Sequence, residues 1–121
     1  MTVTFDSSAW IEYFAGSEKG NKVKQVLERK EPALTPSICL FEIKNKYLQE
    51  GKEFQQRINF ICINSTIIDI DTDIALLGAE IKKKYKLYTI DAIIYATAHQ
   101  HKSILLTGDR HFQELKDAEL L

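Results

Sequence analysis

The chain has 121 residues, enough for one domain with a hydrophobic core and too few for two. Hydrophobic residues make up 45% and charged residues 27% of the sequence, and the formal net charge at pH 7 is −1, which excludes a generally basic nucleic-acid-binding protein. No apolar run approaches the roughly 18 residues of a membrane span, so we expect a cytoplasmic protein with no membrane segment.

The hydrophobic pattern alternates between short apolar strands and amphipathic helices along the chain. In chain order, the expected elements are strand Thr2–Phe5, helix Ala9–Ala15, helix Lys19–Lys30, strand Ala33–Thr35, helix Ile38–Gln49, helix Glu53–Ile63, strand Thr66–Ile70, helix Thr72–Lys84, helix Thr89–His99, strand Ser103–Thr107 and edge strand Ala118–Leu121. Because helices separate the strands, this order predicts a parallel sheet covered on both faces. We therefore expect a single α/β domain over residues 1–121, built as a three-layer α/β/α sandwich with a central parallel sheet.

Small polar residues and glycines mark the ends of the expected helices. Ser7 or Ser8, Thr72 and Thr89 stand where an N-cap is needed, which would make Asp91 the second residue of its helix. Gly16 and Gly51 stand where a left-handed residue would end a helix.

The two cysteines, Cys39 and Cys62, both lie in apolar stretches and have no metal-type spacing. We expect them to be reduced core residues without a disulfide. Trp10, Tyr13 and Phe14 fall at helical spacing and are expected to pack in the core.

Four carboxylates stand out by their positions in these elements. Asp6 follows the first strand, Asp109 follows a later buried strand, and Asp91 lies at the start of a helix. Glu42 lies among apolar neighbours within a helix. Each aspartate alone is also explained as a helix cap or first-turn acid, and Glu42 as a solvated helix-face residue. Because ligands bind beyond the carboxyl ends of parallel strands, the combination predicts one acidic site.

The chemistry of such an acidic site is restrictive. Crowded carboxylates stay ionised together at neutral pH only if cations compensate their charge. Oxygen ligands without paired His or Cys suit Mg²⁺ or Mn²⁺, which make water a better nucleophile and offset charge on a phosphate. With the four acids set aside, 16 basic side chains face 13 acidic ones, which is compatible with a polyanionic partner. The four carboxylates favour phosphodiester hydrolysis. Acyl transfer is disfavoured, because the sequence suggests no Ser-His-Asp triad.

Four segments of the sequence together resemble the signature of the PIN-domain family, and their order and separations resemble those of the VapC toxins of toxin–antitoxin pairs. The segments are Thr4–Phe14, Phe41–Ile43, Thr89–Ala98 and Leu106–Phe112. The resemblance implies an Mg²⁺- or Mn²⁺-dependent endoribonuclease that cleaves RNA, is held inactive by a small antitoxin protein and forms a homodimer.

The resemblance also implies roles for individual residues. The implied catalytic quartet is Asp6, Glu42, Asp91 and Asp109. Asp6, Asp91 and Asp109 are the implied metal ligands, and Ser7 and Thr107 match the hydroxyl positions that hydrogen-bond the acids. His111 stands where many relatives carry another acid, and the three histidines are not spaced as a metal set. No histidine is therefore given a metal role.

Three other functions fit part of the pattern. A haloacid-dehalogenase-like phosphatase needs a second aspartate at position 8, which is Ser8 here. A receiver-type signalling domain needs an acidic pair near the first strand and a late lysine after a strand, where Thr107 and Asp109 stand instead. A catalytically inactive PIN-like binding module differs from the nuclease only in its activity.

Overall fold

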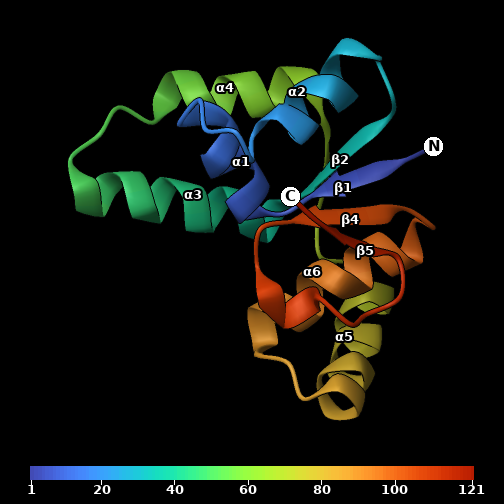
Figure 1. Ribbon diagram of the computed structural model, residues 1–121. Coiled ribbons are helices and arrows are strands. Elements are labelled where there is room, and N and C mark those ends of the chain that lie inside the picture. Colours follow the sequence, from blue (N-terminus) through green and yellow to red (C-terminus); the bar gives the residue numbers. More distant parts are fainter.

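The computed structural model describes residues 1–121 and places a five-stranded sheet between two layers of helices (Figure 1). The strands are β1 Val3–Phe5, β2 Ala33–Pro36, β3 Thr66–Ile68, β4 Ile104–Thr107 and β5 Ala118–Leu120. The helices are α1 Ser7–Phe14, α2 Asn21–Glu28, α3 Ser37–Glu50, α4 Gln55–Asn64, α5 Thr72–Tyr85, α6 Thr89–Gln100 and the short 3₁₀ helix η1 Arg110–Phe112. The predicted α/β/α sandwich is confirmed.

The strand order is β3-β2-β1-β4-β5, and every neighbouring pair is parallel. The chain runs from β1 outward through β2 to β3, then crosses to the other side of β1 to form β4 and β5. The direction of winding therefore switches between β1 and β4, whose registers pair Val3 with Ile104 and Phe5 with Leu106. At such a switch point, a crevice opens beyond the carboxyl ends of the strands.

Two hydrophobic cores lie on the two faces of the sheet. Helices α1, α2 and α4 cover one face, and α5 and α6 cover the other (Figure 1). Neighbouring residues of a strand point to opposite faces, so Leu105 packs with α5 and α6 while Leu106 packs with α1. Helix α3 contributes to both cores, with Cys39 in one and Ile43 in the other.

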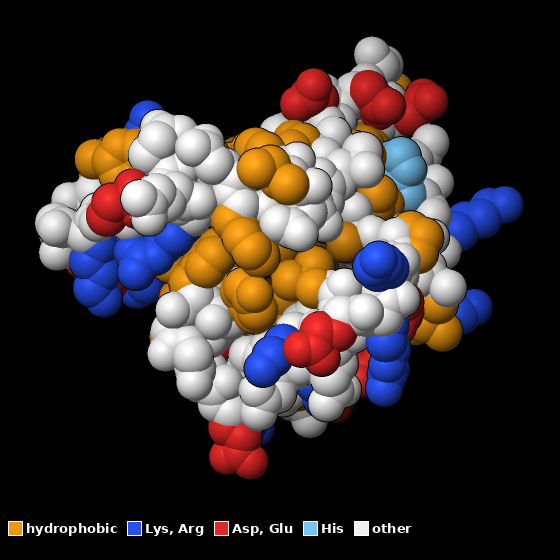
Figure 2. Space-filling model, turned by 90° about the horizontal axis from the view of Figure 1, so that it is seen from above, with side chains coloured by type: hydrophobic (Ala, Val, Ile, Leu, Met, Phe, Trp, Pro, Cys, Tyr) orange, Lys and Arg blue, Asp and Glu red, His pale blue; other side chains and the backbone are white.

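An aromatic cluster fills the core between the sheet and helices α1, α2 and α4. Trp10 is fully buried, stacks on Phe14 with ring centroids 5.8 Å apart and meets Phe60 edge-on at 6.2 Å. The Trp10 indole N–H donates to the hydroxyl of Thr35 at 3.0 Å. Tyr13 stacks on Phe60 at 5.6 Å. The predicted core packing is confirmed for Trp10, whereas Tyr13 and Phe14 are partly buried and pack against the edge of this core. Figure 2 looks onto the layer of helices α1, α2 and α4. Hydrophobic side chains reach the surface at the centre of this view.

Two helix caps differ from those expected. Asp6 caps α1 in place of Ser7 or Ser8, and Asp71 caps α5 in place of Thr72. Each aspartate accepts a hydrogen bond from the backbone N–H three residues on, at 3.0 and 2.8 Å. A carboxylate in the last extended position before the helix reaches that N–H, whereas the next residue is already helical.

The start of α6 also differs from the prediction. Thr89 is the first helical residue and not the cap, and Tyr88 occupies the cap position without a side-chain hydrogen bond. Asp91 is therefore the third helical residue, still within the first turn, where the helix dipole favours a negative charge. Gly16 and Gly51 have φ angles of 67° and 66°, as the helix-end prediction requires.

The two cysteines have different environments. Cys39 is buried as expected, but Cys62 is exposed, because it lies on the outer side of α4. Both are free thiols. None of the helices has the length and apolar content that crossing a membrane requires.

Candidate metal centre

Asp6 lies at the end of β1 and is only 3% exposed. Its Oδ1 accepts hydrogen bonds from the backbone N–H of Ala9 at 3.0 Å and from the hydroxyl of Ser8 at 2.6 Å. Its Oδ2 accepts from the hydroxyl of Thr107. Burial raises the pKa of Asp6 in spite of these three donors, and the charge of Asp109 raises it further.

The hydroxyls of Ser8 and Thr107 form a pair around the Asp6 carboxylate. Each donates to one Asp6 oxygen, and each also accepts a backbone N–H from the loop after β4. Gly108 donates to Ser8 at 2.8 Å, and Asp109 donates to Thr107 at 2.9 Å. The pair therefore joins the start of α1 to the end of β4. Ser8 was not among the predicted site residues.

Glu42 is half-buried on α3, between exposed Phe41 and buried Ile43. The hydroxyl of Ser7 donates to Glu42 Oε1 at 2.6 Å. The negative charge of Glu42 also contributes to the raised pKa of Asp91. Glu42 thus lies on the side of α3 that faces the other acids, and the two consecutive serines serve two different carboxylates.

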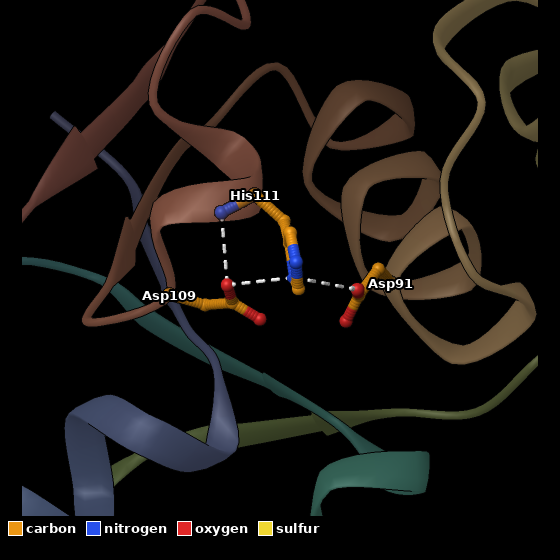
Figure 3. A group of neighbouring side chains, drawn as sticks. All are labelled: Asp91, Asp109 and His111. Carbon is orange, nitrogen blue, oxygen red and sulfur yellow. Dashed lines mark hydrogen bonds and ion pairs between the residues drawn. The ribbon is translucent and has the colours of Figure 1, made fainter.

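Asp91 on α6 and Asp109 after β4 bring their carboxylates close to each other (Figure 3). The Asp91 side chain is 17% exposed, and its pKa is raised to about 6, first by burial and then by the charge of Asp109. Asp109 precedes η1, and its Oδ1 accepts the backbone N–H of His111 at 2.9 Å. That hydrogen bond fixes the orientation of the Asp109 carboxylate.

His111 lies between these two aspartates (Figure 3). Its Nδ1 is 3.0 Å from Asp109 Oδ1 and 3.9 Å from Asp91 Oδ2. One potential ligand atom from each of the three residues lies within 4.8 Å of the other two. Asp6 and Glu42 do not belong to this close group but act on Asp91 through their charge. The spacing of the histidines in the sequence did not predict that His111 would join the acids. Its position two residues after Asp109 was the signal that could have placed it there.

The four acids have no lysine or arginine partner within ion-pair distance. The ion pairs of the structure that involve lysine or arginine all lie elsewhere on the surface, and His111 alone reaches two of the acids. Carboxylate oxygens gathered without a cationic side chain are a donor set that fits a hard divalent cation.

Known proteins share the sequence pattern and the fold of this chain. Residues 3–118 match the family described as PIN domain. No curated protein sequence matches the chain. A toxin–antitoxin complex from Klebsiella pneumoniae contains a similar chain, with 28% sequence identity and a TM-score of 0.81, over 97% of this chain and 95% of that one.

Two more distant structures share the fold. VapBC2 from Rickettsia felis, bound to a DNA fragment from its promoter, is 15% identical with a TM-score of 0.79, over 100% of this chain and 98% of that one. VapC20 from Mycobacterium tuberculosis, described as a sarcin–ricin loop cleaving toxin, is 14% identical with a TM-score of 0.72, over 94% and 95% of the two chains.

Proposed function

The chain belongs to the PIN-domain family, and we propose that it is a divalent-metal-dependent endoribonuclease acting as the toxin of a toxin–antitoxin pair. The observation that carries this proposal is the convergence of Asp6, Glu42, Asp91 and Asp109 at the carboxyl end of the sheet without a lysine or arginine partner. Such a charge distribution is favourable when a divalent cation binds it.

Asp91 and Asp109, with Asp6 beside them, would hold Mg²⁺ or Mn²⁺. When bound, such an ion acidifies water and offsets the negative charge that develops on a phosphate during hydrolysis. The chain's own residues prepare the site for this. The three donors around Asp6 keep its carboxylate in one orientation, and the backbone N–H of His111 does the same for Asp109.

Glu42 has a different role in the proposal. Ser7 occupies Glu42 Oε1 at 2.6 Å, which holds the side chain toward the other acids and leaves Oε2 to accept a hydrogen bond from the attacking water. The phosphatase alternative needs an aspartate at position 8 itself, and the receiver alternative needs an acidic pair near the first strand. The serines instead donate to Asp6 and Glu42, which favours the nuclease.

RNA is the proposed substrate and a small antitoxin protein the proposed partner. The Klebsiella pneumoniae relative comes from a toxin–antitoxin complex and resembles this chain over nearly its whole length. Large hydrophobic side chains are exposed on α3 and α4, namely Phe41, Leu48 and Ile63. A bound antitoxin would cover such side chains. Homodimerisation stays a prediction of the family resemblance, and sedimentation of the purified chain tests it.

Cleavage of RNA by the purified chain tests the nuclease. We expect cleavage with Mg²⁺ or Mn²⁺, none with EDTA, and a loss of orders of magnitude in Asp109→Asn. Asp117→Asn is the matched control, because Asp117 is exposed and precedes β5, at the opposite edge of the sheet from the four acids. Full activity in Asp109→Asn would remove that residue from the site. Wild-type protein that binds an antitoxin but cleaves no RNA with either ion would identify an inactive binding module.

Expression in cells tests the toxin. The gene alone should arrest growth, and co-expression of the protein encoded beside it should restore growth. Leu48→Glu should weaken capture of that protein while cleavage in vitro persists, because Leu48 is exposed and lies away from the acids on α3. Unchanged capture would place the antitoxin on another surface.

A further inference from the structure

We propose that His111 is a nitrogen ligand of the divalent cation, so that the site binds Mn²⁺ in preference to Mg²⁺. This inference rests on the proposed function, because it assumes that the neighbouring carboxylates hold a metal. It goes beyond that function by adding a ligand type and an ion preference. The starting observation is the close group of Asp91, Asp109 and His111, drawn from two separate segments of the chain (Figure 3).

The distances within this group suit one octahedral ion. With metal–ligand bonds of roughly 2.1 Å, neighbouring donor atoms of an octahedron lie about 3 Å apart and opposite ones about 4.2 Å apart. His111 Nδ1 lies 3.0 Å from Asp109 Oδ1 and 3.9 Å from Asp91 Oδ2. The first distance matches an octahedral edge, and the second falls between an edge and a diagonal. Both distances from His111 Nδ1 therefore lie within the span of one octahedral ion, and the whole group lies within 4.8 Å.

A simple hydrogen bond from the imidazole to Asp109 explains less of the geometry. The backbone N–H of His111 already donates to the same Asp109 oxygen at 2.9 Å. The imidazole nitrogen meets a carboxylate on each side, and 3.9 Å is too long for a hydrogen bond to Asp91. A nitrogen ligand accounts for both approaches together.

The surroundings of His111 hold the ring in this position. The backbone of His111 is fixed by Asp109, which precedes η1 and accepts its N–H. Tyr88, just before α6, meets the imidazole edge-on with ring centroids 5.7 Å apart. The His111 side chain is otherwise 61% exposed, so the second ring nitrogen can carry its proton into solvent while Nδ1 faces the acids.

The ion preference follows from the ligand type. Imidazole nitrogen is a softer donor than carboxylate oxygen and binds Mn²⁺ and later divalent metals better than Mg²⁺. A site with oxygen ligands alone suits Mg²⁺ and Mn²⁺ alike and gains no preference for Mn²⁺ from a nitrogen ligand. His111 would therefore raise the affinity for Mn²⁺ more than the affinity for Mg²⁺.

Pulsed EPR of the Mn²⁺-loaded protein tests the inference without measuring activity. We expect a ¹⁴N coupling from a directly bound imidazole in the wild-type chain and in His101→Asn, and its loss in His111→Asn. His101 is the matched control, because it is an exposed histidine after α6. Calorimetry should show that His111→Asn binds Mn²⁺ about tenfold or more weakly, while Mg²⁺ affinity changes by less than about threefold.

The outcomes separate this inference from the nuclease proposal. Mn²⁺ bound without a nitrogen coupling, or with a coupling that persists in His111→Asn, would overturn the role of His111 and leave the carboxylate site standing. A wild-type chain that binds neither Mn²⁺ nor Mg²⁺ would overturn both. If His111→Asn does not fold, His111→Gln replaces it, and the absence of a nitrogen coupling from the wild-type spectrum overturns the role of His111 by itself.

Discussion

The two halves of the acidic site hold their charge in different ways. The hydroxyl-bound half consists of Asp6, Ser8 and Thr107, and the open half consists of Asp91, Asp109 and His111. Asp6 is 3% exposed and accepts three hydrogen bonds, whereas Asp91 is 17% exposed and has His111, at 3.9 Å, as its one basic neighbour. Burial raises the pKa of both carboxylates, but the fold surrounds the first with three hydrogen-bond donors, whereas the second depends on what binds beside it. Mutations in the two halves should therefore change stability in opposite directions.

Removing the Asp6 side chain should have the largest effect on stability. Asp6→Ala removes the cap of α1 and leaves the two hydroxyls without their acceptor, so we expect the free energy of unfolding to fall by about 2–3 kcal/mol. Asp71→Ala is the matched control, since Asp71 caps α5 with one hydrogen bond at 2.8 Å. It should cost about 1 kcal/mol. Urea unfolding in EDTA measures both, and equal losses would mean that the hydroxyl pair contributes nothing.

Asp91→Asn should have the opposite sign and should depend on pH. The pKa of Asp91 is about 6 in the folded chain against 3.8 for an unperturbed aspartate. The folded state therefore binds more protons between these values, and Asp91 makes the metal-free protein less stable as pH rises from about 4 to about 6. Asp91→Asn should be more stable than wild type at pH 7 by up to about 2 kcal/mol, with no advantage below pH 4.

Thermal unfolding in EDTA across this pH range measures that effect. Asp117→Asn, at an exposed position on the opposite edge of the sheet, should show no such difference from wild type. Saturating Mn²⁺ should reverse the order at pH 7, because it stabilises the wild type more than the variant. A difference between wild type and Asp91→Asn that is independent of pH would show that Asp91 has no special environment.

The two adjacent serines hydrogen-bond different carboxylates, so their substitutions should have different effects. Ser8→Ala should lower the free energy of unfolding by about 1 kcal/mol, because Asp6 loses a donor and the Gly108 N–H loses its acceptor. Ser7→Ala should cost less than about 0.5 kcal/mol, yet reduce RNA cleavage by freeing Glu42. Urea unfolding and a cleavage assay on both variants separate the roles. Equal stability losses would contradict the assignment of one serine to each carboxylate.

Glu42→Gln should change stability least. The substitution keeps the shape and the contact with Ser7, so we expect a change within about 0.5 kcal/mol. Cleavage should nevertheless fall by orders of magnitude, and the variant gene should no longer arrest growth. If Glu42→Gln cleaves RNA at the wild-type rate, Glu42 is a surface residue and takes no part in the reaction.

Sequence reasoning predicted the sheet and the general location of the acids because both follow from chain order. Asp6 and Asp109 each follow a buried strand, and parallel strands bring such positions to one edge. The caps were less predictable, because Asp6 and the serines beside it are all good N-cap residues and only backbone geometry decides which one caps. The exposure of Cys62 was missed because apolar neighbours in sequence do not fix the face of a helix.

The partners within the site were also beyond sequence reasoning. Successive helical residues point about 100° apart, so Ser7 and Ser8 necessarily face different neighbours, but their sequence does not say which. His111 and Asp91 lie in different segments, and a spacing rule applied along the chain cannot detect a group that forms only through folding.

The hydrogen bond from Thr107 to Asp6 has a consequence for the time at which the proposed nuclease site is assembled. The two residues are 101 positions apart, which corresponds to roughly 5–20 s of synthesis at typical translation rates. Until Ile104–Thr107 has been made, β1 is the edge of an incomplete sheet and Asp6 lacks the hydroxyl that orients it. Pairing of strands this distant is also a slow step in folding. A ribosome-bound nascent chain therefore carries three of the four acids without an assembled site, and under the proposed function the ability to cut RNA arises only after the last strands have formed.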